Sequence, residues 1–310
     1  MKHLPQQVSI TDVCARDGFQ MEKNFIATED KIKLINLLSK LGFPKLEYTS
    51  FVSPKAIAQM KDAEQVTQEI EKTAGVIYAA LVPNLKGAQR AINAGADELV
   101  QVISVSEAHN LANVRMKLSD SLSNAKEIIR LSGQHNIPVT VGLATAFGCP
   151  YAGRVSPEQV LKLADQVLKL GAHSLVIADT TGMANPVQVY EFLCRFRSEF
   201  SDTVVSLHFH NTRGMAMANI VAGLEAGITI YETSLGGLGG CPFAPGATGN
   251  VATEDVVHML EEMGIDTGIN LEGVLEAARE LERIIGRQLP GHVLKAGKVC
   301  DLHPLPSNQA

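Results

Sequence analysis

Two histidines stand two residues apart in the segment VVSLHFHNTRG, at His208 and His210. The segment is apolar and β-branched, which favours a strand, and a strand repeats every two residues. Both imidazoles should therefore leave the same face. Two neutral imidazoles on one rigid face supply half of a divalent-metal site. A single histidine here would more often be a satisfied core residue, and the pair makes the two interpretations about equal.

The dipeptide Arg16-Asp17 follows the predicted strand VSITDV. Such a pair is most often a surface ion pair on a turn. Asp17 combined with His208 and His210 would instead give one oxygen and two nitrogen ligands and leave open positions. That donor set suits Mg²⁺ or Mn²⁺ better than a closed structural zinc site.

Further carboxylates fall within or at the ends of predicted strands, at Glu47, Asp179 and Glu232. In one interpretation Glu47 and Asp179 orient Arg16 or bind substrate, and in the other they belong to a hydrogen-bonded layer at the top of the barrel. The sequence favours neither interpretation over the other.

A glycine-rich loop, GGLGGCPFAPGATGN, runs from Gly236 to Asn250 and carries Cys241. Glycine permits positive φ and mobility, so the loop can close over a site with Cys241 as a proton donor or acceptor. Cys149, in FGCPYAG, is a weaker candidate that we expect in the site wall, and Cys194, in YEFLCRF, should be a core residue. Asn250 is either a metal ligand through its amide oxygen or the cap of the next helix.

These residues are embedded in a repeated strand-then-helix pattern. Strands are predicted over 8–13, 45–50, 76–82, 97–104, 138–147, 174–180, 204–211 and 229–234. Helices are predicted over 28–42, 62–73, 84–95, about 120–135, 156–171, from Pro186 onward, 214–227 and 252–264. Eight such units with continuously apolar strands indicate a (β/α)₈ TIM barrel, whose chemistry lies at the carboxyl ends of the strands. A doubly wound sheet is disfavoured because no G-x-G-x-x-G motif is present.

In a closed barrel, strands one and seven flank strand eight, so Asp17 should converge with the histidine pair. Helix boundaries follow from capping residues: Thr28 and Gly42 for the first helix, Ser156 with Pro157 and Gln159 for a later one, and Asn185 with Pro186 and Gln188 for the next. We expect one domain over 1–310, with the barrel over about 8–264. The remainder, 265–310, carries an added amphipathic helix over 270–289.

Composition limits the possible partners. The 310 residues are 45% hydrophobic and 19% charged, with a net charge of −6, which is typical of a globular enzyme. No long basic run predicts nucleic-acid or membrane binding, and no apolar stretch is long enough to cross a bilayer. Five cysteines without a CxxC pair indicate reduced thiols, and we expect a cytoplasmic protein.

Several longer segments resemble the 3-hydroxy-3-methylglutaryl-CoA lyase family, within a metal-dependent TIM-barrel superfamily of lyases and synthases. The resemblance covers most of the chain and rests on ARDGFQMEKNF, EYTSFVSPKAIAQMKD, VPNLKGAQRAINAGADE, FGCPYAGR, SLHFHNTRGMAMANI and GGLGGCPFAPGATGN. The Arg-Asp-Gly and His-x-His elements are common to the superfamily. The SFVSPK and GGLGGCP segments are more specific to the lyases.

The resemblance implies a retro-Claisen lyase that releases acetyl-CoA and acetoacetate. It implies Mg²⁺ or Mn²⁺ bound by Asp17, His208, His210 and Asn250. Arg16 would stabilise the enolate oxygen and Cys241 would protonate the enolate carbon. Glu47 and Asp179 match acidic residues around the substrate, and we expect Gln20 and Thr180 to contact the acyl-CoA.

Departures from the family pattern bear on the substrate. Cys14-Ala15 replaces the usual Gly-Pro, and the segment SEAHNLANVRMKLSDS and the wall at 143–146 also differ. A related acyl-CoA such as citramalyl-CoA is therefore an alternative, and a condensing synthase and a non-catalytic paralogue are weaker ones. We also expect a homo-oligomer, and Cys300 lies where some relatives carry a regulatory thiol.

Overall fold

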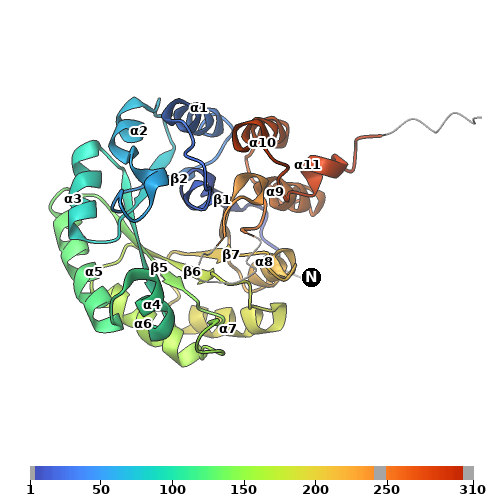
Figure 1. The fold of residues 1–310 in the computed structure, drawn as a ribbon. Helices are drawn as coiled ribbons and strands as arrows, with labels where there is room; N and C mark the ends of the chain where they lie inside the picture. Colours follow the sequence, from blue (N-terminus) through green and yellow to red (C-terminus); the bar gives the residue numbers. More distant parts are fainter. Residues whose placement is uncertain (1–3, 241–248, 303–310) are drawn as a thin grey trace, which may run out of the picture.

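Eight parallel strands pair in chain order, and the last pairs with the first, so the sheet closes into a barrel (Figure 1). This computed structural model describes residues 4–240 and 249–302. The strands are β1 Ser9–Asp12, β2 Lys45–Ser50, β3 Ile77–Leu81, β4 Glu98–Ser104, β5 Val139–Ala144, β6 Ser174–Asp179, β7 Val205–Phe209 and β8 Ile230–Thr233. The predicted TIM barrel is confirmed, although β5 ends at Ala144, three residues before the predicted end.

Helices surround the barrel and alternate with its strands (Figure 1). They are α1 Thr28–Leu38, α2 Ala63–Glu69, α3 Leu85–Ala94, α5 Leu118–Gly133, α6 Pro157–Lys169, α7 Pro186–Glu199, α8 Ala216–Glu225 and α9 Thr253–Glu262. Each predicted helix is therefore found, usually shorter by a few residues.

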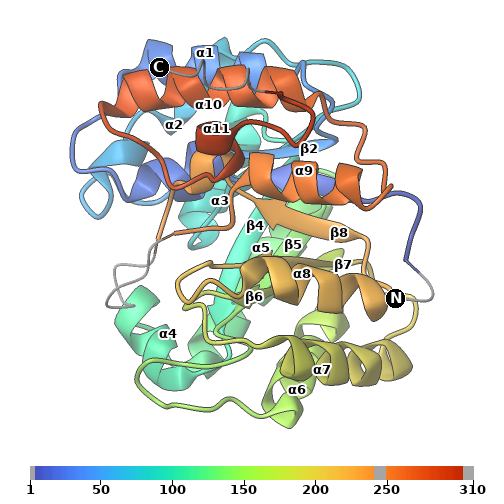
Figure 2. The same ribbon diagram turned by 90° about the vertical axis from the view of Figure 1, so that its right-hand side faces the viewer.

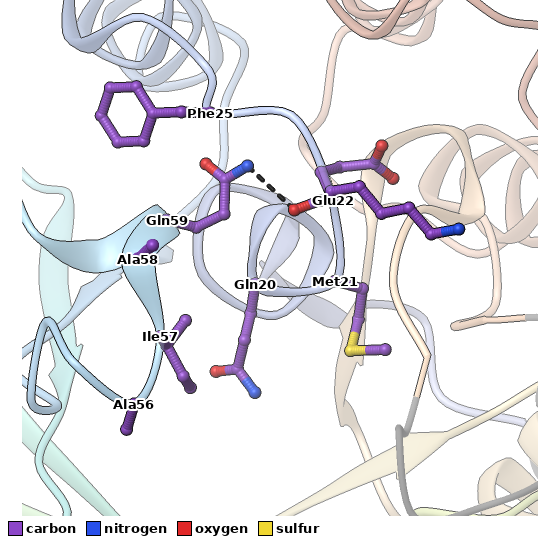
Figure 3. A pocket seen from close by; sticks show the side chains of 9 residues that line it. Gln20, Met21, Glu22, Phe25, Ala56, Ile57, Ala58 and Gln59 are labelled. Atoms are coloured by element: carbon purple, nitrogen blue, oxygen red, sulfur yellow. Dashed lines mark hydrogen bonds between the residues drawn. The ribbon is translucent and has the colours of Figure 1, made fainter.

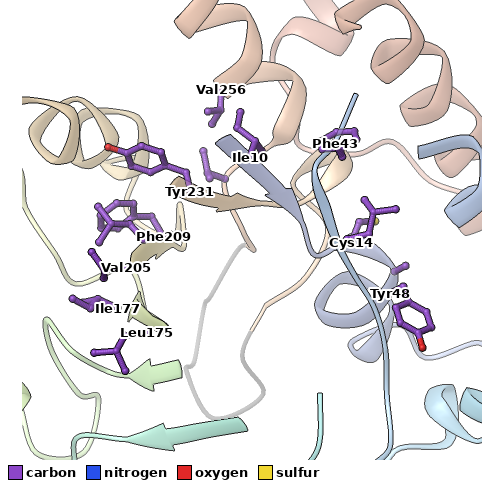
Figure 4. Packing of buried hydrophobic residues seen from close by; sticks show 14 of the residues in the cluster. Ile10, Cys14, Phe43, Tyr48, Leu175, Ile177, Val205, Phe209, Tyr231 and Val256 are labelled. Atoms are coloured by element: carbon purple, nitrogen blue, oxygen red, sulfur yellow. The ribbon is translucent and has the colours of Figure 1, made fainter. Parts of the chain in front are cut away.

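The main hydrophobic core lies between the strands and these helices. Outward-facing strand residues such as Ile10, Leu175, Phe209 and Tyr231 are at most 1% exposed and pack in this layer (Figure 4). Burying each aliphatic or phenylalanine side chain contributes roughly 1.5–3 kcal/mol. The inward face of the strands is also enclosed, and it carries buried polar and charged side chains as well as apolar ones.

Strand register identifies the residues that face the barrel interior. Residues paired across parallel strands point to the same side of the sheet. Thr140 of β5 is paired in register with Val100 of β4 on one side and with Ser174 of β6 on the other. At the amino-terminal end, Lys45 pairs with Glu98, which accepts a hydrogen bond from Thr140 at 2.5 Å, and the hydroxyls of Thr140 and Ser174 are 2.5 Å apart. This hydrogen-bonded layer fills that end of the barrel and leaves the opposite end for the site.

The capping residues give a mixed outcome. Ser156 and Gln159 form a complete capping box at α6, and Asn185 accepts from Gln188 N at α7, as predicted. Thr28 was wrongly predicted as a cap: Ala27 is the N-cap of α1, and the Thr28 hydroxyl donates to Asp62 at 2.9 Å instead.

Gly42 was wrongly predicted as the end of α1, which ends at Leu38. Gly42 instead has φ +96°, and an added Cβ would lie 2.1 Å from the carbonyl oxygen of Gly268. The turn after α1 therefore requires glycine for both its backbone conformation and its close contact.

Several described elements lie outside the repeat. They are η1 Cys14–Gly18, η2 Ala58–Met60, α4 Glu107–Val114, η3 Leu235–Gly237, α10 Leu271–Ile285 and α11 Val293–Ala296. The added helix α10 was predicted, and it packs beside α1 and α9 (Figure 2). The short helix α4 was not predicted. No described helix has the length and apolar character needed to traverse a bilayer.

Candidate active site

The turn after β1 holds Arg16 and Asp17 at the barrel mouth. Residues Cys14–Gly18 form a single π-helical turn, and Val13 N donates to Thr233 O of β8 at 2.8 Å. Arg16 is 8% exposed and pairs with Asp17 and with Glu47 of β2. The alternative of a surface ion pair is therefore wrong, because both partners of Arg16 are enclosed with it.

Asp17, His208 and His210 converge on one point. Each offers a ligand atom, and these atoms lie within 4.8 Å of one another. The imidazole rings of His208 and His210 have centroids 5.1 Å apart, so the two-residue spacing does place both on one face. Strands β1, β7 and β8 are neighbours, which accounts for the convergence.

Glu232 orients one of these histidines. His208 Nδ1 lies 3.0 Å from Glu232 Oε2, and the two residues are paired in register between β7 and β8. A carboxylate on one ring nitrogen fixes the tautomer and leaves Nε2 available as a ligand. Sequence reasoning noted Glu232 at a strand end but gave it no role, because the register between two strands cannot be read from one sequence.

Two buried polar atoms at this point have no hydrogen-bond partner among the described residues: His210 Nδ1 and Asn250 Oδ1. Asn250 Nδ2 donates to Asp17 Oδ2 at 2.7 Å and to Leu238 O at 3.0 Å. The alternative of Asn250 as a helix cap is wrong, since Ala252 is the N-cap of α9. An unsatisfied imidazole nitrogen and amide oxygen beside a carboxylate are the donor set that a divalent metal accepts, so the residues fit such an ion.

The local electrostatics favour a charged Arg16, an ionised Asp17 and a neutral His210, whereas Glu232 outweighs burial and raises the pKa of His208. Burial opposes the charged form of Arg16, but the carboxylates of Glu47 and Asp17 outweigh it and raise the pKa of the guanidinium. Burial would raise the pKa of Asp17, but Arg16 and the histidines reverse this and lower it. Burial, and then His208, lower the pKa of His210 to about 3, so its imidazole is neutral at pH 7.

The other predicted acidic residue, Asp179, does not contact Arg16 among the described interactions. Its carboxylate accepts from Met183 N at 2.8 Å and Ala184 N at 3.0 Å, and burial raises its pKa to about 6. Its carbonyl accepts from His210 N at 3.2 Å. Asp179 therefore holds the turn after β6 through its carboxylate and the backbone at His210 through its carbonyl.

Thr180 is half-buried beside this turn. Its hydroxyl accepts from Thr145 N at 3.1 Å. Thr145 has φ +58°, a left-handed conformation that is rare for a β-branched residue and is typical of functional sites.

Gln20 lies beside the barrel mouth, in a pocket of about 310 Å³ between the turn after η1 and the segment at η2 (Figure 3). Met21, Phe25 and Ile57 also line the pocket, and Gln59 donates to Glu22 O at 3.0 Å. This pocket is separate from the cluster of Asp17 and the histidines, and no side chain of that cluster lines it.

The cysteines differ from expectation in one case. Cys241 lies outside the described residues. Cys194 is exposed on α7, so its assignment to the core was wrong. Cys149 is fully buried, and its sulfur accepts from Tyr151 N and Ala152 N at 3.4 Å, which makes it part of a tight turn.

Behind the site, a buried carboxylate supports the start of the loop after β8. Glu254 Oε2 accepts from Gly236 N at 3.0 Å, and burial raises the pKa of Glu254 to about 8. A Cβ added to Gly291 would lie 1.9 Å from Glu254 Oε1, so the segment before α11 is closely packed on this carboxylate.

Comparison with known proteins gives a consistent family. Residues 7–281 match the family described as HMGL-like. The chain is 45% identical to a hydroxymethylglutaryl-CoA lyase of Bacillus subtilis, over 95% of this chain and 98% of that one. It is 39% identical to the human mitochondrial hydroxymethylglutaryl-CoA lyase, over 96% of this chain and 91% of the human one.

Solved structures agree. A lyase of Acinetobacter baumannii, in complex with coenzyme A and 3-methylmalate, superposes with a TM-score of 0.95 at 45% identity, covering 99% of this chain and all of that one. A Bacillus subtilis HMG-CoA lyase has a TM-score of 0.92 at 44% identity, covering 94% of this chain and 98% of that one.

Proposed function

The chain belongs to the HMGL-like family, and we infer that it is a carbon–carbon lyase that cleaves 3-hydroxy-3-methylglutaryl-CoA to acetyl-CoA and acetoacetate. Similarity over the whole barrel supports this reaction. Within the chain, the observation that carries it is the buried cluster of Asp17, His208 and His210 with Arg16 beside it.

The proposed reaction splits one substrate into two products and needs no second reactant. The C3 hydroxyl loses its proton and becomes the ketone of acetoacetate, while the C2–C3 bond breaks. The electron pair passes to C2 as the enolate of acetyl-CoA, and a proton delivered to C2 completes the products. Negative charge thus grows on the thioester oxygen as the bond breaks, which is where a fixed cation lowers the barrier.

Arg16 is the proposed cation. Its enclosure between Asp17 and Glu47 holds the guanidinium in place before substrate arrives, so little reorganisation is needed when the charge develops. Cys241 is the proposed proton donor to C2, and Gln20 and Thr180 are proposed substrate contacts.

Asp17, His208, His210 and Asn250 would hold Mg²⁺ or Mn²⁺, and Glu232 would fix the His208 tautomer. When bound, such an ion acts as a Lewis acid that lowers the pKa of a substrate hydroxyl. The unsatisfied atoms of His210 and Asn250 support this ligand set.

A second candidate is a lyase for a related branched hydroxyacyl-CoA such as citramalyl-CoA. It is favoured by the Acinetobacter baumannii lyase, which was solved with 3-methylmalate, another methyl-branched hydroxy acid of similar size. The test is coupled detection of acetyl-CoA from both thioesters, before and after chelation and Mg²⁺ addition. Acetoacetate release that chelation abolishes supports the first function, and preferential cleavage of citramalyl-CoA supports the second.

A single-domain homo-oligomer in the cytoplasm also remains a prediction. Light scattering during size-exclusion chromatography would measure the assembly, and fractionation of the producing cells would measure the compartment.

A further inference from the structure

The barrel interior has two chemically different halves. Register places Glu47, His208 and Glu232 on the inward face of β2, β7 and β8, next to Arg16 and Asp17. Toward the mouth, the inward face of β3 to β6 is mainly apolar. Its apolar residues are Leu81, Val102, Gly142, Ala144, Val176 and Ala178, and its polar residue is Ser104, whose hydroxyl lies 2.8 Å from His109 Nδ1. The described charged residue on the inward face of these four strands, Glu98, lies at the other end and pairs with Lys45.

The apolar half borders open space. Leu81 and Val102 are only half-buried, although both lie within strands. The outward-facing neighbours of Val102, which α5 covers, are fully buried: Gln101 is 2% and Ile103 is 0% exposed (Figure 1). Because helices cover the outer face, the exposed surface of Leu81 and Val102 must face the interior at the barrel mouth.

Gly142 enlarges that space. It lies in the middle of β5, where glycine is disfavoured unless a ligand or another backbone approaches closely. A Cβ added there would have Val102 Cγ2 as its nearest neighbour, at 3.3 Å, and the three nearest atoms all belong to β4. No described atom from across the barrel comes as close, so the added methyl would point into the interior beside Val102.

We propose that this apolar wall binds the alkyl substituent on C3 of the substrate, and that Gly142 is the residue that determines the size of the substituent accepted. The proposal rests on the proposed lyase function, which puts a carbon with a hydroxyl and an alkyl group between the two halves. The charged half takes the hydroxyl and the thioester, and the apolar half takes the alkyl group. Glycine at 142 leaves room for a group larger than methyl.

The experiment uses three thioesters that differ only at C3: 3-hydroxyglutaryl-CoA, its 3-methyl form and its 3-ethyl form. The wild-type enzyme should cleave the methyl and ethyl forms. Gly142→Ala should lower kcat/KM for the ethyl form about 10-fold more than for the methyl form, since one methylene in an apolar pocket discriminates by roughly 10–200-fold. Val102→Ala should change the ratio in the opposite direction.

The matched control is Gly133→Ala, a glycine-to-alanine change at the exposed end of α5 where an added Cβ meets nothing within 4 Å. It should leave the substrate ratios unchanged. Mn²⁺ affinity, measured for every variant, should stay at the wild-type value and thereby show that the barrel is intact.

Two results would overturn the proposal while the lyase function stands: methyl cleavage without measurable ethyl cleavage by the wild type, or an equal loss for both thioesters in Gly142→Ala. Failure of the wild type to cleave any of the three thioesters would instead reject the proposed lyase function.

Discussion

Replacing Glu232 with glutamine should weaken Mn²⁺ binding by about 10-fold, and replacing it with alanine by up to about 100-fold, the range found for residues that orient metal ligands. The Glu232 and His208 side chains are 7% and 9% exposed, so water screens their 3.0 Å interaction little. Glutamine keeps an acceptor for Nδ1–H but loses the charge that strengthens the hydrogen bond. Alanine removes the acceptor as well and leaves the tautomer of His208 unfixed.

The change is measured by calorimetric titration of metal-free protein with Mn²⁺. A 10-fold larger dissociation constant corresponds to a loss of about 1.4 kcal/mol in binding free energy. The same loss should appear as a smaller gain in the free energy of unfolding at a fixed, saturating Mn²⁺ concentration, because a ligand stabilises the folded state by RT ln(1 + [L]/Kd). Cleavage activity at low metal should fall in parallel and recover as metal is raised.

Glu98 offers a matched control, since it is also a buried inward carboxylate but pairs with Lys45 at the opposite end of the barrel. Glu98→Gln should lower stability and leave Mn²⁺ affinity unchanged. Wild-type Mn²⁺ affinity in Glu232→Gln would refute the orienting role, and an equal loss in Glu98→Gln would show a general effect of destabilisation.

Three further outcomes are expected. Arg16→Gln should lower kcat by about 10²–10³, as the loss of one stabilising donor does in other enzymes, and leave the metal content unchanged. Loss of metal, measured by elemental analysis, would mean that Arg16 mainly supports Asp17. Cys241→Ser should lower kcat by roughly 10²–10⁴, whereas Cys194→Ser, at an exposed position, should leave both turnover and stability near wild type; near-native kcat in the first variant would assign the proton to another group. Burial raises the pKa of Glu254 from 4.5 to about 8, so the folded state binds this proton more tightly than the unfolded state does. The proton therefore contributes to the free energy of unfolding. This contribution is complete below about pH 4.5 and declines as the pH rises to about 8. Glu254→Gln should flatten that decline in urea unfolding at pH 5 and pH 8, and an unchanged pH dependence would contradict the buried neutral carboxyl.

The sequence predicted the barrel and the convergence of Asp17 with the two histidines because both depend on local patterns. Alternating strand and helix segments specify the repeat, and the two-residue spacing of His208 and His210 places them on one face. The loop after β1 was correctly assigned to the mouth because parallel barrels collect strand ends there.

The remaining features depend on contacts between distant segments. The proposed role of Glu232 depends on the register between β7 and β8, and that of Gly142 depends on the register between β4 and β5. Thr28 failed as a cap because Asp62, 34 residues away, accepts its hydroxyl. The prediction that Cys194 lies in the core was wrong because the apolar residues around it do not specify which side of α7 faces the barrel.

The proposed metal ligands stand at 17, 208, 210 and 250, on either side of the junction where β1 meets β8. A chain still under synthesis therefore gains no full ligand set until residue 250 has left the ribosome. After that, the ion would join the first strand to the last two and oppose opening of the barrel at this seam. Metal supply would then influence how much of the protein a cell retains, because an open seam exposes strand edges to proteases.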